Sequence, residues 1–426
     1  MRATKDSGVD WLGEIPADWV MKPFFALGDQ VKKLNRAEEE KNLLSLSYGE
    51  IIRKDIDANS GLLPESFGTY QIVEDGDLVF RFTDLQNDQK SLRSALVREH
   101  GIITNAYLGF RPSRVNSRFL NHLMRAYDLQ KVFYAMGSGL RQSLTFAEVR
   151  RLSVVCPPLE EQRAIADFLG RETTKIDTLI AKQEQLITTL GERRQAVISR
   201  AVTTGLDTDV VLEESGIEWY GVKPSHWVMS KICRSFHLTL GKTVNGGDEK
   251  TGFELPYLRA ANIQDFGIDL SEVKRLFLSA SEVRRLQLVA GDVVVVEGGG
   301  GYGRSDLLRF DMEGWAFQNH VIRLRSRPLQ SSAFLNYFIK HLRSIGHFER
   351  LASFATIPNV SADKLGQIEF PNMPFAEAES IASYLDEETK KIDASIEKAA
   401  EIVCLLAERR QSLISAAVTG ELEVAR

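Results

Sequence analysis

The strongest constraint on how this chain can fold is a stretch of sequence that occurs twice. Residues 172–203 and 388–419 align without a gap at a constant spacing of 216 positions. Both copies contain Glu-Arg-Arg-Gln, at 192–195 and at 408–411. Self-similarity at a fixed spacing sets an architecture before local propensity does. The sequence therefore predicts two copies of one structural unit.

Both copies carry apolar residues at steps of three and four, the pattern of a coiled-coil seam. The predicted seam residues are Ile176, Leu179, Leu186, Leu190 and Val197, then Ile392, Ala399, Ile402, Leu406 and Leu413. Neither copy contains proline, and good helix formers fill the remaining positions. We expect each copy to be a helix of roughly 30 residues, about 45 Å long. Because one helix of this length cannot bury its apolar stripe alone, we expect two long antiparallel helices packed as a coiled coil.

Composition predicts an ordinary cytoplasmic protein of more than one domain. At 426 residues the chain exceeds a single typical core, so two or three domains are expected. Cys156, Cys233 and Cys404 are odd in number and widely spaced, which favours a reduced compartment and no metal site. The absence of a long apolar run argues against secretion or membrane insertion. A net charge of -5 argues against indiscriminate nucleic-acid binding but permits a local basic surface.

A second repeated element opens each half of the chain. Its residues Gly8, Trp11, Gly13, Pro16 and Trp19 return 208 positions later as Gly216, Trp219, Gly221, Pro224 and Trp227. Four of the five tryptophans lie in this element. Such spacing suits a short irregular segment held by two buried rings, so we expect a structural clasp at the start of each half.

Short strands and one helix are predicted between each clasp and the long helix that follows. The expected strands are 77–82, 104–110, 293–296 and 316–324, and the expected helices are 119–132 and 334–342. The halves agree in order but share little identity here. The predicted α+β organisation is a first variable domain with its clasp (1–157), a first helix region (158–206), a second clasp and variable domain (207–373) and a second helix region (374–426).

Further motifs complete this pattern across the whole chain. They are Trp-Leu-Gly-Glu-Ile-Pro at 11–16 with Trp19, Pro-Pro-Leu-Glu-Glu-Gln at 157–162 with Ile165 and Leu169, and Ala-Val-Thr at 201–203 and 417–419 with Gly420. In their order and spacing they resemble the specificity subunit of a Type I restriction-modification system. The second half departs from the family pattern at 374–379, where Pro-Phe-Ala-Glu-Ala-Glu replaces a Pro-x-x-Glu-Gln run. This departure affects only the expected cap of the second helix.

The resemblance implies a non-catalytic DNA reader. Each variable region would be a target recognition domain that reads one half of a split site in double-stranded DNA, and the helices would form a spacer that docks the partners. Those partners would be two methyltransferase subunits and restriction subunits, which would carry S-adenosylmethionine, ATP and magnesium, while this chain binds no cofactor. Independently, two unlike domains on a rigid spacer predict a bipartite, asymmetric, gapped target, and a pseudo-dimeric spacer predicts two similar docking faces.

Candidate DNA contacts are polar side chains that follow the predicted strands and loops. They are Arg81, Thr83, Gln86, Ser138, Arg141, Gln142 and Ser143 in the first domain, and Tyr302, Arg304, Ser305, Asn319, His320 and Thr356 in the second. Two arginine sets could follow phosphates or simply face solvent: Arg111, Arg114 and Arg118, and Arg323, Arg325 and Arg327. Solvated loop residues without a ligand are the alternative for all of these positions.

The repeated Glu-Arg-Arg-Gln runs have two interpretations. The partner-docking candidates are Glu192, Arg193, Arg194, Gln195, Glu408, Arg409, Arg410 and Gln411. In the predicted seam, Arg193 and Arg409 fall between the helices, where each could pair with the opposite helix. The runs could therefore serve subunit docking or the pairing of the two helices.

A catalytic alternative rests on two motifs. Gly298-x-Gly300-x-x-Gly303 follows a predicted strand, as a dinucleotide fingerprint does, but no convincing helix follows it. Asp265 with Glu272 and Lys274 resembles a metal-dependent nuclease set. No phosphate-binding loop, adenine-methyltransferase motif or histidine metal spacing is present in the sequence. The alternative to a DNA reader is a stand-alone nucleotide-dependent enzyme or a metal-dependent nuclease.

Overall fold

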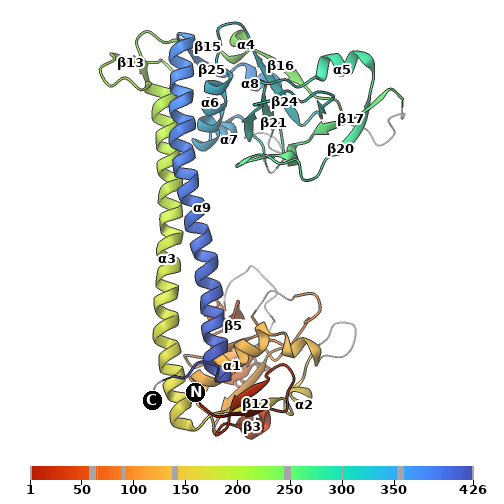
Figure 1. Cartoon of the computed structure of the whole chain (residues 1–426), viewed down its shortest axis with the longest axis vertical. Coiled ribbons are helices and arrows are strands. Elements are labelled where there is room, and N and C mark those ends of the chain that lie inside the picture. The colour runs from red at the N-terminus through yellow and green to blue at the C-terminus, as the bar shows by residue number, and fades with distance from the viewer. Residues whose placement is uncertain are drawn as a thin grey trace. The chain divides into compact units, whose positions relative to one another are not determined.

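The computed structural model describes residues 2–56, 64, 66–88, 92–136, 143–243, 251–299, 301–352 and 359–424. The chain divides into two compact units. The first unit comprises Met1–Glu184 with Glu401–Arg426, and the second comprises Gln185–Ala400. Each unit combines one mixed domain with parts of both long helices, α3 (Leu159–Thr204) and α9 (Phe375–Thr419) (Figure 1).

The two long helices exceed the expected length of roughly 30 residues. α3 has 46 residues and α9 has 45, because each begins directly after a proline. The Pro158 carbonyl accepts the first intrahelical bond of α3 from Gln162, and Pro374 does the same for Ala378 in α9. The added turns carry Ile165 and other apolar residues that pack into the domain cores rather than onto the other helix. Ile165, Ala166 and Leu169 recur as Ile381, Ala382 and Leu385 at the same 216-residue spacing, so the repeat extends upstream of the stretch that begins at Glu172.

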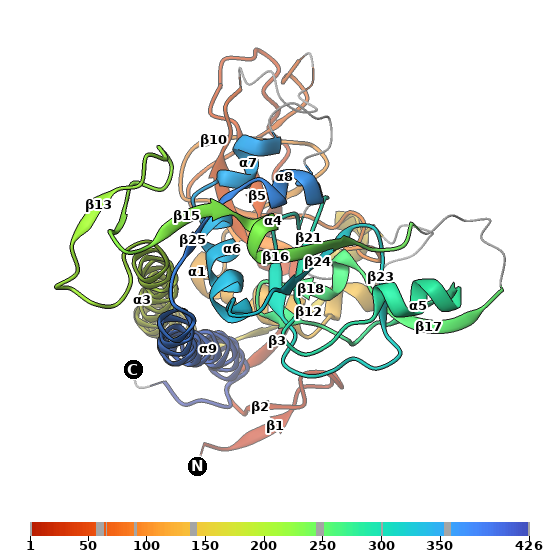
Figure 2. The ribbon, with the colours of Figure 1, turned by 90° about the horizontal axis from the view of Figure 1, so that it is seen from above.

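Within each unit α3 and α9 lie side by side, as the end-on view also shows (Figure 2). The predicted seam is partly wrong. Leu179, Leu186 and Ile402 are 46%, 44% and 41% exposed, so they face outward. The predicted Ile176 and Leu190 are in the observed seam, whose other members in the middle of α3 are Ile180, Gln183, Ile187 and Arg194. Their equivalents 216 positions later are also buried or half-buried in α9.

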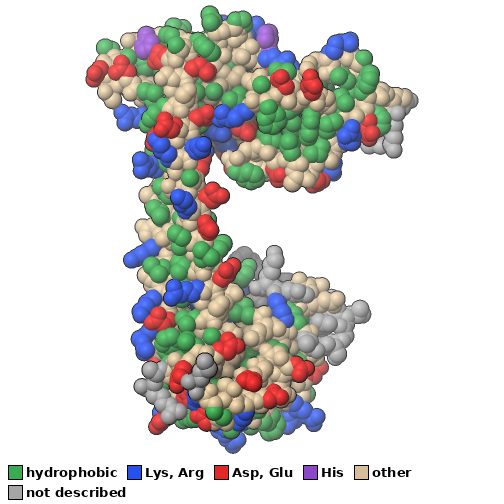
Figure 3. Space-filling model, in the orientation of Figure 1, with side chains coloured by type: hydrophobic (Ala, Val, Ile, Leu, Met, Phe, Trp, Pro, Cys, Tyr) green, Lys and Arg blue, Asp and Glu red, His purple; other side chains and the backbone are tan. Residues whose placement is uncertain are grey.

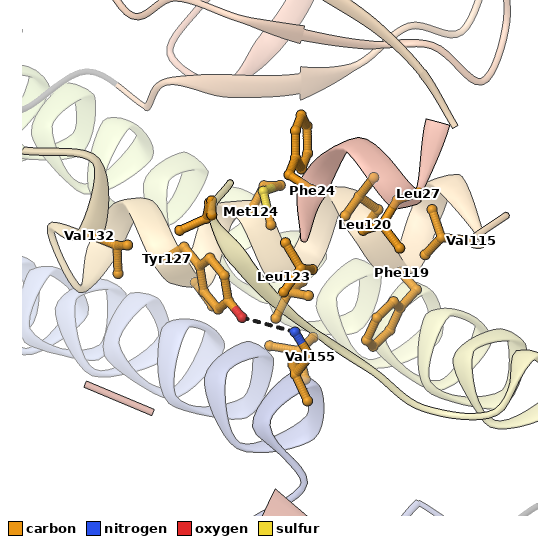
Figure 4. Close-up of a cluster of buried hydrophobic side chains, with 14 of the residues drawn as sticks. Phe24, Leu27, Val115, Phe119, Leu120, Leu123, Met124, Tyr127, Val132 and Val155 are labelled. Atoms are coloured by element: carbon orange, nitrogen blue, oxygen red, sulfur yellow. Dashed lines mark hydrogen bonds between the residues drawn. The ribbon is translucent and has the colours of Figure 1, made fainter. Parts of the chain in front are cut away.

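The first domain is built on a four-stranded antiparallel sheet in the order β4-β11-β8-β9. These strands are Gly28–Gln30, Leu108–Pro112, Leu78–Phe80 and Ser94–Leu96, and the paired strands beside them are β3 (Val20–Pro23) with β12 (Ser153–Cys156), β5 (Leu44–Ser47) with β6 (Glu50–Arg53), and β7 (Gln71–Val73) with β10 (Gly101–Ile103). Helix α1 (Ser117–Leu129) packs on the core, and α2 (Phe146–Val149) is a single turn. The Tyr127 hydroxyl of α1 accepts the Val155 N–H at 3.3 Å, which ties α1 to β12 (Figure 4).

The second domain repeats this plan with a sheet in the order β16-β24-β21-β22. These strands are Phe236–Leu240, Val321–Ser326, Val293–Val296 and Ser305–Leu307, and the other strands are β15 (Val228–Lys231) with β25 (Glu369–Asn372), β20 (Lys274–Leu278) with β17 (Phe253–Leu258) and β23 (Ala316–Phe317), and β18 (Ile263–Gln264) with β19 (Gly267–Ile268). Its helices are α4 (Ile232–Ser235), α5 (Ala280–Leu286), α6 (Ser332–Ser344), α7 (His347–Ala352) and α8 (Ala362–Gly366). α6 occupies the place in the second core that α1 occupies in the first.

Each clasp is a short hairpin, β1 (Thr4–Asp6) with β2 (Glu14–Pro16) and β13 (Leu212–Glu214) with β14 (Val222–Pro224). Trp19 and Trp227 are each 1% exposed, as expected of buried rings. The first clasp binds the start of α3 through the Arg2–Glu161 ion pair. In the second clasp, the Trp227 indole N–H donates to Glu377 of α9 at 2.9 Å. The clasps are therefore structural elements that hold the ends of the long helices.

The glycine that ends α9 supports a first prediction. Gly420 has φ +87, and a Cβ built on it would lie 2.4 Å from Cδ of Pro16 in the first clasp. Gly420→Ala should therefore lower the free energy of unfolding by about 2 kcal/mol, since it adds left-handed strain and a steric clash. The matched control is Gly191→Ala in α3, where no described atom lies within 4 Å of the added carbon. Urea denaturation of the control should show a gain of up to about 1 kcal/mol, and equal effects at both sites would contradict this account.

Candidate DNA-reading and docking surfaces

The candidate residues of the first domain gather at the end of β8. Arg81 is half-buried and lies 3.9 Å from the Asp88 carboxylate, and Gln86 is exposed. The Leu144 N–H donates to the Phe82 carbonyl at 2.9 Å, which brings exposed Ser143 beside the same strand end. Ser138, Arg141 and Gln142 lie outside the described residues.

A buried arginine that the sequence analysis missed holds this loop in place. Arg93 is 0% exposed, and its guanidinium donates to the carbonyls of Thr83 at 3.0 Å and Asp88 and to the Tyr134 hydroxyl at 3.3 Å. Its backbone N–H donates to Asp128 of α1 at 2.7 Å. Arginine is rarely buried unless its donors are satisfied. Arg93 therefore fixes the loop that carries Thr83 and Gln86, although no sequence motif marks it.

The candidates of the second domain flank the end of β21. The Val296 N–H donates to the Arg304 carbonyl at 2.8 Å, and the Glu297 N–H donates to the His320 carbonyl at 2.9 Å. The strand end thus brings Arg304, Asn319 and exposed His320 together. Ser305 is 4% exposed and its hydroxyl bonds Asn336 at 2.9 Å, so it ties β22 to α6 and is not at the surface. Thr356 lies outside the described residues.

The Arg304 side chain belongs to a network that also presents an exposed ring. Arg304 donates to the Gln264 side chain at 2.9 Å and pairs with Asp265 at 3.3 Å, and Asp265 also pairs with Arg343. Between β18 and β19, the neighbouring Phe266 is 83% exposed. The sequence analysis missed Phe266 because its surroundings predict only a turn. An exposed ring beside arginines is a common platform for nucleic-acid bases.

Arginines that were candidates for phosphate contacts instead brace each domain. In the first domain Arg111 donates to both carboxylate oxygens of Asp77, at 2.8 and 2.7 Å. In the second domain Arg325 donates to both oxygens of Asp292, each at 2.7 Å. These carboxylates are 2% and 0% exposed, and they raise the pKa of the arginines. Arg323 is also buried, 6% exposed, and donates to backbone carbonyls. These contacts account for the placement of the three arginines, and a phosphate contact by any of them stays a prediction.

The Glu-Arg-Arg-Gln runs place different arginines in the seam than expected. Arg193 and Arg409 are exposed, so the prediction that they lie between the helices is wrong. Arg194 pairs with Asp393 in the second unit, and Arg410 pairs with Asp177 in the first, both at 2.8 Å. The pairs are equivalent under the 216-residue spacing, which shows that the repeat extends to side-chain contacts. Half-exposed pairs add about 0–1 kcal/mol each, so their main effect is on helix register.

The other members of the runs remain available for a partner. Gln195 donates to the Ser199 hydroxyl at 3.2 Å along its own helix. The exposed members are Glu192, Arg193, Glu408, Arg409 and Gln411. Their role in docking stays a prediction.

A buried histidine beside α3 makes stability in the second unit depend on pH. His341 of α6 is 4% exposed, and its Nδ1 lies 2.9 Å from the Ser199 hydroxyl. Burial lowers the pKa of His341 to about 4 from the usual 6.5. Its contribution is complete above pH 6.5 and is lost as the pH falls toward 4, because only the unfolded chain takes up the proton.

We therefore expect the free energy of unfolding to fall by about 2 kcal/mol between neutral pH and pH 5 through this residue. Urea denaturation of His341→Gln should lack this part of the pH dependence. His237→Gln, at an exposed position on β16, is the control and should retain it. An identical pH dependence in wild type and His341→Gln would refute the assignment.

Neither motif of the catalytic alternative forms its site. Gly298 and Gly303 lie in the connection between antiparallel strands β21 and β22, so a strand and not a pyrophosphate-binding helix follows the motif. Asp265 pairs with Arg304 and Arg343, whereas Glu272 pairs with Arg259 at 3.3 Å. Over the part of the chain that the structure describes, no group of His, Cys, Asp and Glu could hold a metal ion. These findings give the alternative no support.

Charge on the visible face is mixed. Figure 3 shows Lys and Arg interspersed with Asp and Glu on this face, without one large basic area. Among the described helices, none is long and apolar enough to cross a membrane.

Comparison with known proteins agrees with the architecture. No known protein-family model matches the chain. The EcoKI specificity subunit, from a Type I restriction enzyme of Escherichia coli (strain K12), is 24% identical over 304 residues, 66% of this chain and 62% of that protein. The StySPI specificity subunit of Salmonella potsdam is 22% identical over 448 residues, 96% and 90% of the two chains. The chain thus matches less than two thirds of the first relative and most of the second.

Solved structures show the same fold. A chain from a study of complex assembly and conformational transition in the type I R-M system has a TM-score of 0.71 at 16% identity, covering 96% of this chain and 99% of that chain. The chain is similar to Type I specificity subunits in sequence. The HsdS subunit from Thermoanaerobacter tengcongensis has a TM-score of 0.53 at 17% identity, covering 96% and 98%. The predicted fold, two repeated domains joined by long helices, is confirmed.

Proposed function

We propose that this chain is the DNA-reading, non-catalytic specificity subunit of a Type I restriction-modification complex. The observation that carries the proposal is the repeat, in which equivalent helices with equivalent ion pairs carry two unlike domains. Unlike domains on equivalent supports suit a target with two different half-sites. The similarity to relatives that are named specificity subunits supports the same proposal.

The reading surfaces in this proposal are the ends of β8 and β21. Arg81, Gln86 and Ser143 would contact the first half-site, and Arg304 and His320 the second, since arginine and glutamine side chains suit base edges and phosphates. Phe266 would stack on or beside bases of the second half-site. The gap between the half-sites would be set by the long helices.

The partners would be methyltransferase and restriction subunits. Two methyltransferase subunits would dock on equivalent faces of α3 and α9, using the exposed members of the Glu-Arg-Arg-Gln runs. S-adenosylmethionine, ATP and magnesium would bind those partners. The methyltransferase subunit would flip an adenine out of the duplex to modify it.

A selection experiment tests this proposal. The complex of this chain with its methyltransferase subunit is incubated with a library of random duplexes, and the retained duplexes are sequenced. We expect a gapped motif with two different halves, and Gln86→Ala and Phe266→Ala should each relax one half only. Retention of duplexes without any common motif would refute the proposal.

A further inference from the structure

The first unit contains a pocket where α1, α3 and α9 meet. Its volume is about 940 Å³, and its lining is mainly polar. The lining residues that matter here are Gly170 of α3, Asn121, His122 and Arg125 of α1, and Arg410 of α9. The long helices and the domain both contribute, so an occupant would contact both.

The equivalent place in the second unit is occupied by the chain itself. α1 and α6 align at a spacing of 215 positions, which places Tyr337 at the position of His122. The Tyr337 hydroxyl donates to the Asp386 carboxylate at 2.7 Å, and Arg309 donates to both oxygens of Asp386, at 3.0 and 3.1 Å. Asp386 corresponds to Gly170 under the 216-residue spacing of the helices. The second unit thus has a carboxylate, Asp386, at a position where the first unit has only Gly170.

Nothing in the local structure of α3 requires glycine at position 170. Glycine inside a helix costs about 1 kcal/mol relative to alanine. No described atom lies within 4 Å of a Cβ built on Gly170, so neither close packing nor a neighbouring backbone demands it. Its backbone is helical, without a positive φ. The effect of glycine here is to keep the pocket open at the place where Asp386 sits in the second unit.

The pocket has the electrostatic character of an anion site. Burial, together with the nearby charges of Arg125, Arg410, Arg118 and Arg98, lowers the pKa of His122 to about 4. His122 is therefore neutral at physiological pH, and the field at its ring is positive. In the described part of the chain, the buried Nε of Arg125, a donor, has no hydrogen-bond partner.

Acidic residues also line the pocket, and their positions limit what can enter. Asp177 pairs with Arg410, and Glu99 pairs with Arg53 at 2.6 Å. Glu50 and Asp75 complete the acidic set. A DNA strand brings a phosphate every few ångströms and would meet these carboxylates. Arg118 already pairs with Asp167 at 2.7 Å and Arg410 with Asp177 at 2.8 Å, so a single acidic side chain that enters would share these two arginines with their own carboxylates.

We propose that this pocket receives an aspartate or glutamate side chain of the protein that docks on α3 and α9. The inference rests on the proposed function, which makes that protein the methyltransferase subunit. The two docking faces then differ, because the second unit supplies its own carboxylate through Asp386 and the first unit takes one from the partner. The acidic side chain would lie among Arg118, Arg125 and Arg410.

Substitution of Gly170 tests the proposal in the full-length chain. Gly170→Asp supplies the missing carboxylate from within, and Gly170→Asn is the control of equal size without charge. The affinity for the methyltransferase subunit is measured by titration at low and high salt, and thermal melting of the free chain checks that each variant folds. We expect Gly170→Asp to weaken capture by about tenfold or more at low salt, and Gly170→Asn to stay within about threefold of wild type.

A second variant, Arg118→Gln, tests the proposal in case Gly170→Asp does not fold. Arg118 is 52% exposed, so Arg118→Gln should fold normally and weaken capture by a smaller factor. If wild type captures the subunit and Gly170→Asp captures it equally well, this inference falls and the proposed function stands. If Gly170→Asp instead weakens duplex binding by the assembled complex without affecting capture, the pocket serves a DNA phosphate and the inference is overturned. If wild type captures no methyltransferase subunit, both fall.

Discussion

Replacing Arg93 with methionine should lower the free energy of unfolding of the first unit by about 3–5 kcal/mol. The guanidinium is 0% exposed and is the donor for the carbonyls of Thr83 and Asp88. Methionine keeps much of the side-chain volume but removes the guanidinium that donates to these part-buried carbonyls. The loop that carries Gln86 should then lose its fixed position. We expect the complex to lose discrimination at the first half-site while discrimination at the second is retained.

Denaturation by urea and sequence selection with the assembled complex together check this expectation. The control is Arg53→Met, which removes an arginine from the Arg53–Glu99 ion pair at a side chain that is 73% exposed. Exposed pairs contribute about 0–1 kcal/mol, so the control should be nearly neutral. Should Arg93→Met prove as stable as the control, Arg93 does not hold the reading loop.

Replacing Asp292 with alanine should destabilise the second unit by a similar amount, about 3–5 kcal/mol. The Asp292 carboxylate is 0% exposed and accepts two bonds from Arg325 and one from the Val289 N–H at 2.9 Å. The substitution leaves a cation and an N–H beside a cavity, and both lose their acceptor. Since Val293 and its neighbours in β21 follow directly, the end of β21 that carries Arg304 should be disturbed.

An exposed ion pair in the same unit provides the comparison. Glu254 and Arg275 lie 4.0 Å apart with side chains 53% and 55% exposed, so Glu254→Gln should change the free energy of unfolding by less than about 1 kcal/mol. The test compares the urea midpoints of Asp292→Ala and Glu254→Gln, and we expect a clearly lower midpoint for Asp292→Ala. Equal midpoints would mean that the Asp292–Arg325 contact does not brace the sheet.

The architecture could be predicted well from the sequence because the sequence contains an internal repeat. Repetition identified the long helices and the clasps without any knowledge of contacts, and Trp19 and Trp227 are buried as their size suggests. The phase of the seam was harder to predict. Leu179 and Ile180 are adjacent and both apolar, so periodicity alone did not separate the exposed residue from the half-buried one. The length of the helices was also underestimated, because it was taken from the stretch that begins at Glu172, whereas α3 begins at Leu159.

The candidate sites were predictable only where a side chain follows a strand directly. Arg81 and Arg304 lie at strand ends, as expected, whereas the hydroxyl of Ser305 points to Asn336 in the interior. Asp393 was missed because its partner Arg194 lies 199 positions away, and Arg93 was missed because its guanidinium donates to backbone carbonyls, which no side-chain pattern marks. The same holds for the pocket at Gly170, which is recognisable only by comparison with the second unit.

A map of methylated adenines tests the central claim most directly. It compares DNA from cells that express the methyltransferase subunit with this chain and DNA from cells that express the subunit alone. The account predicts a gapped motif with two different halves that is methylated only when this chain is present. Identical maps from the two strains, with both proteins expressed, would contradict the claim that this chain reads the DNA sequence.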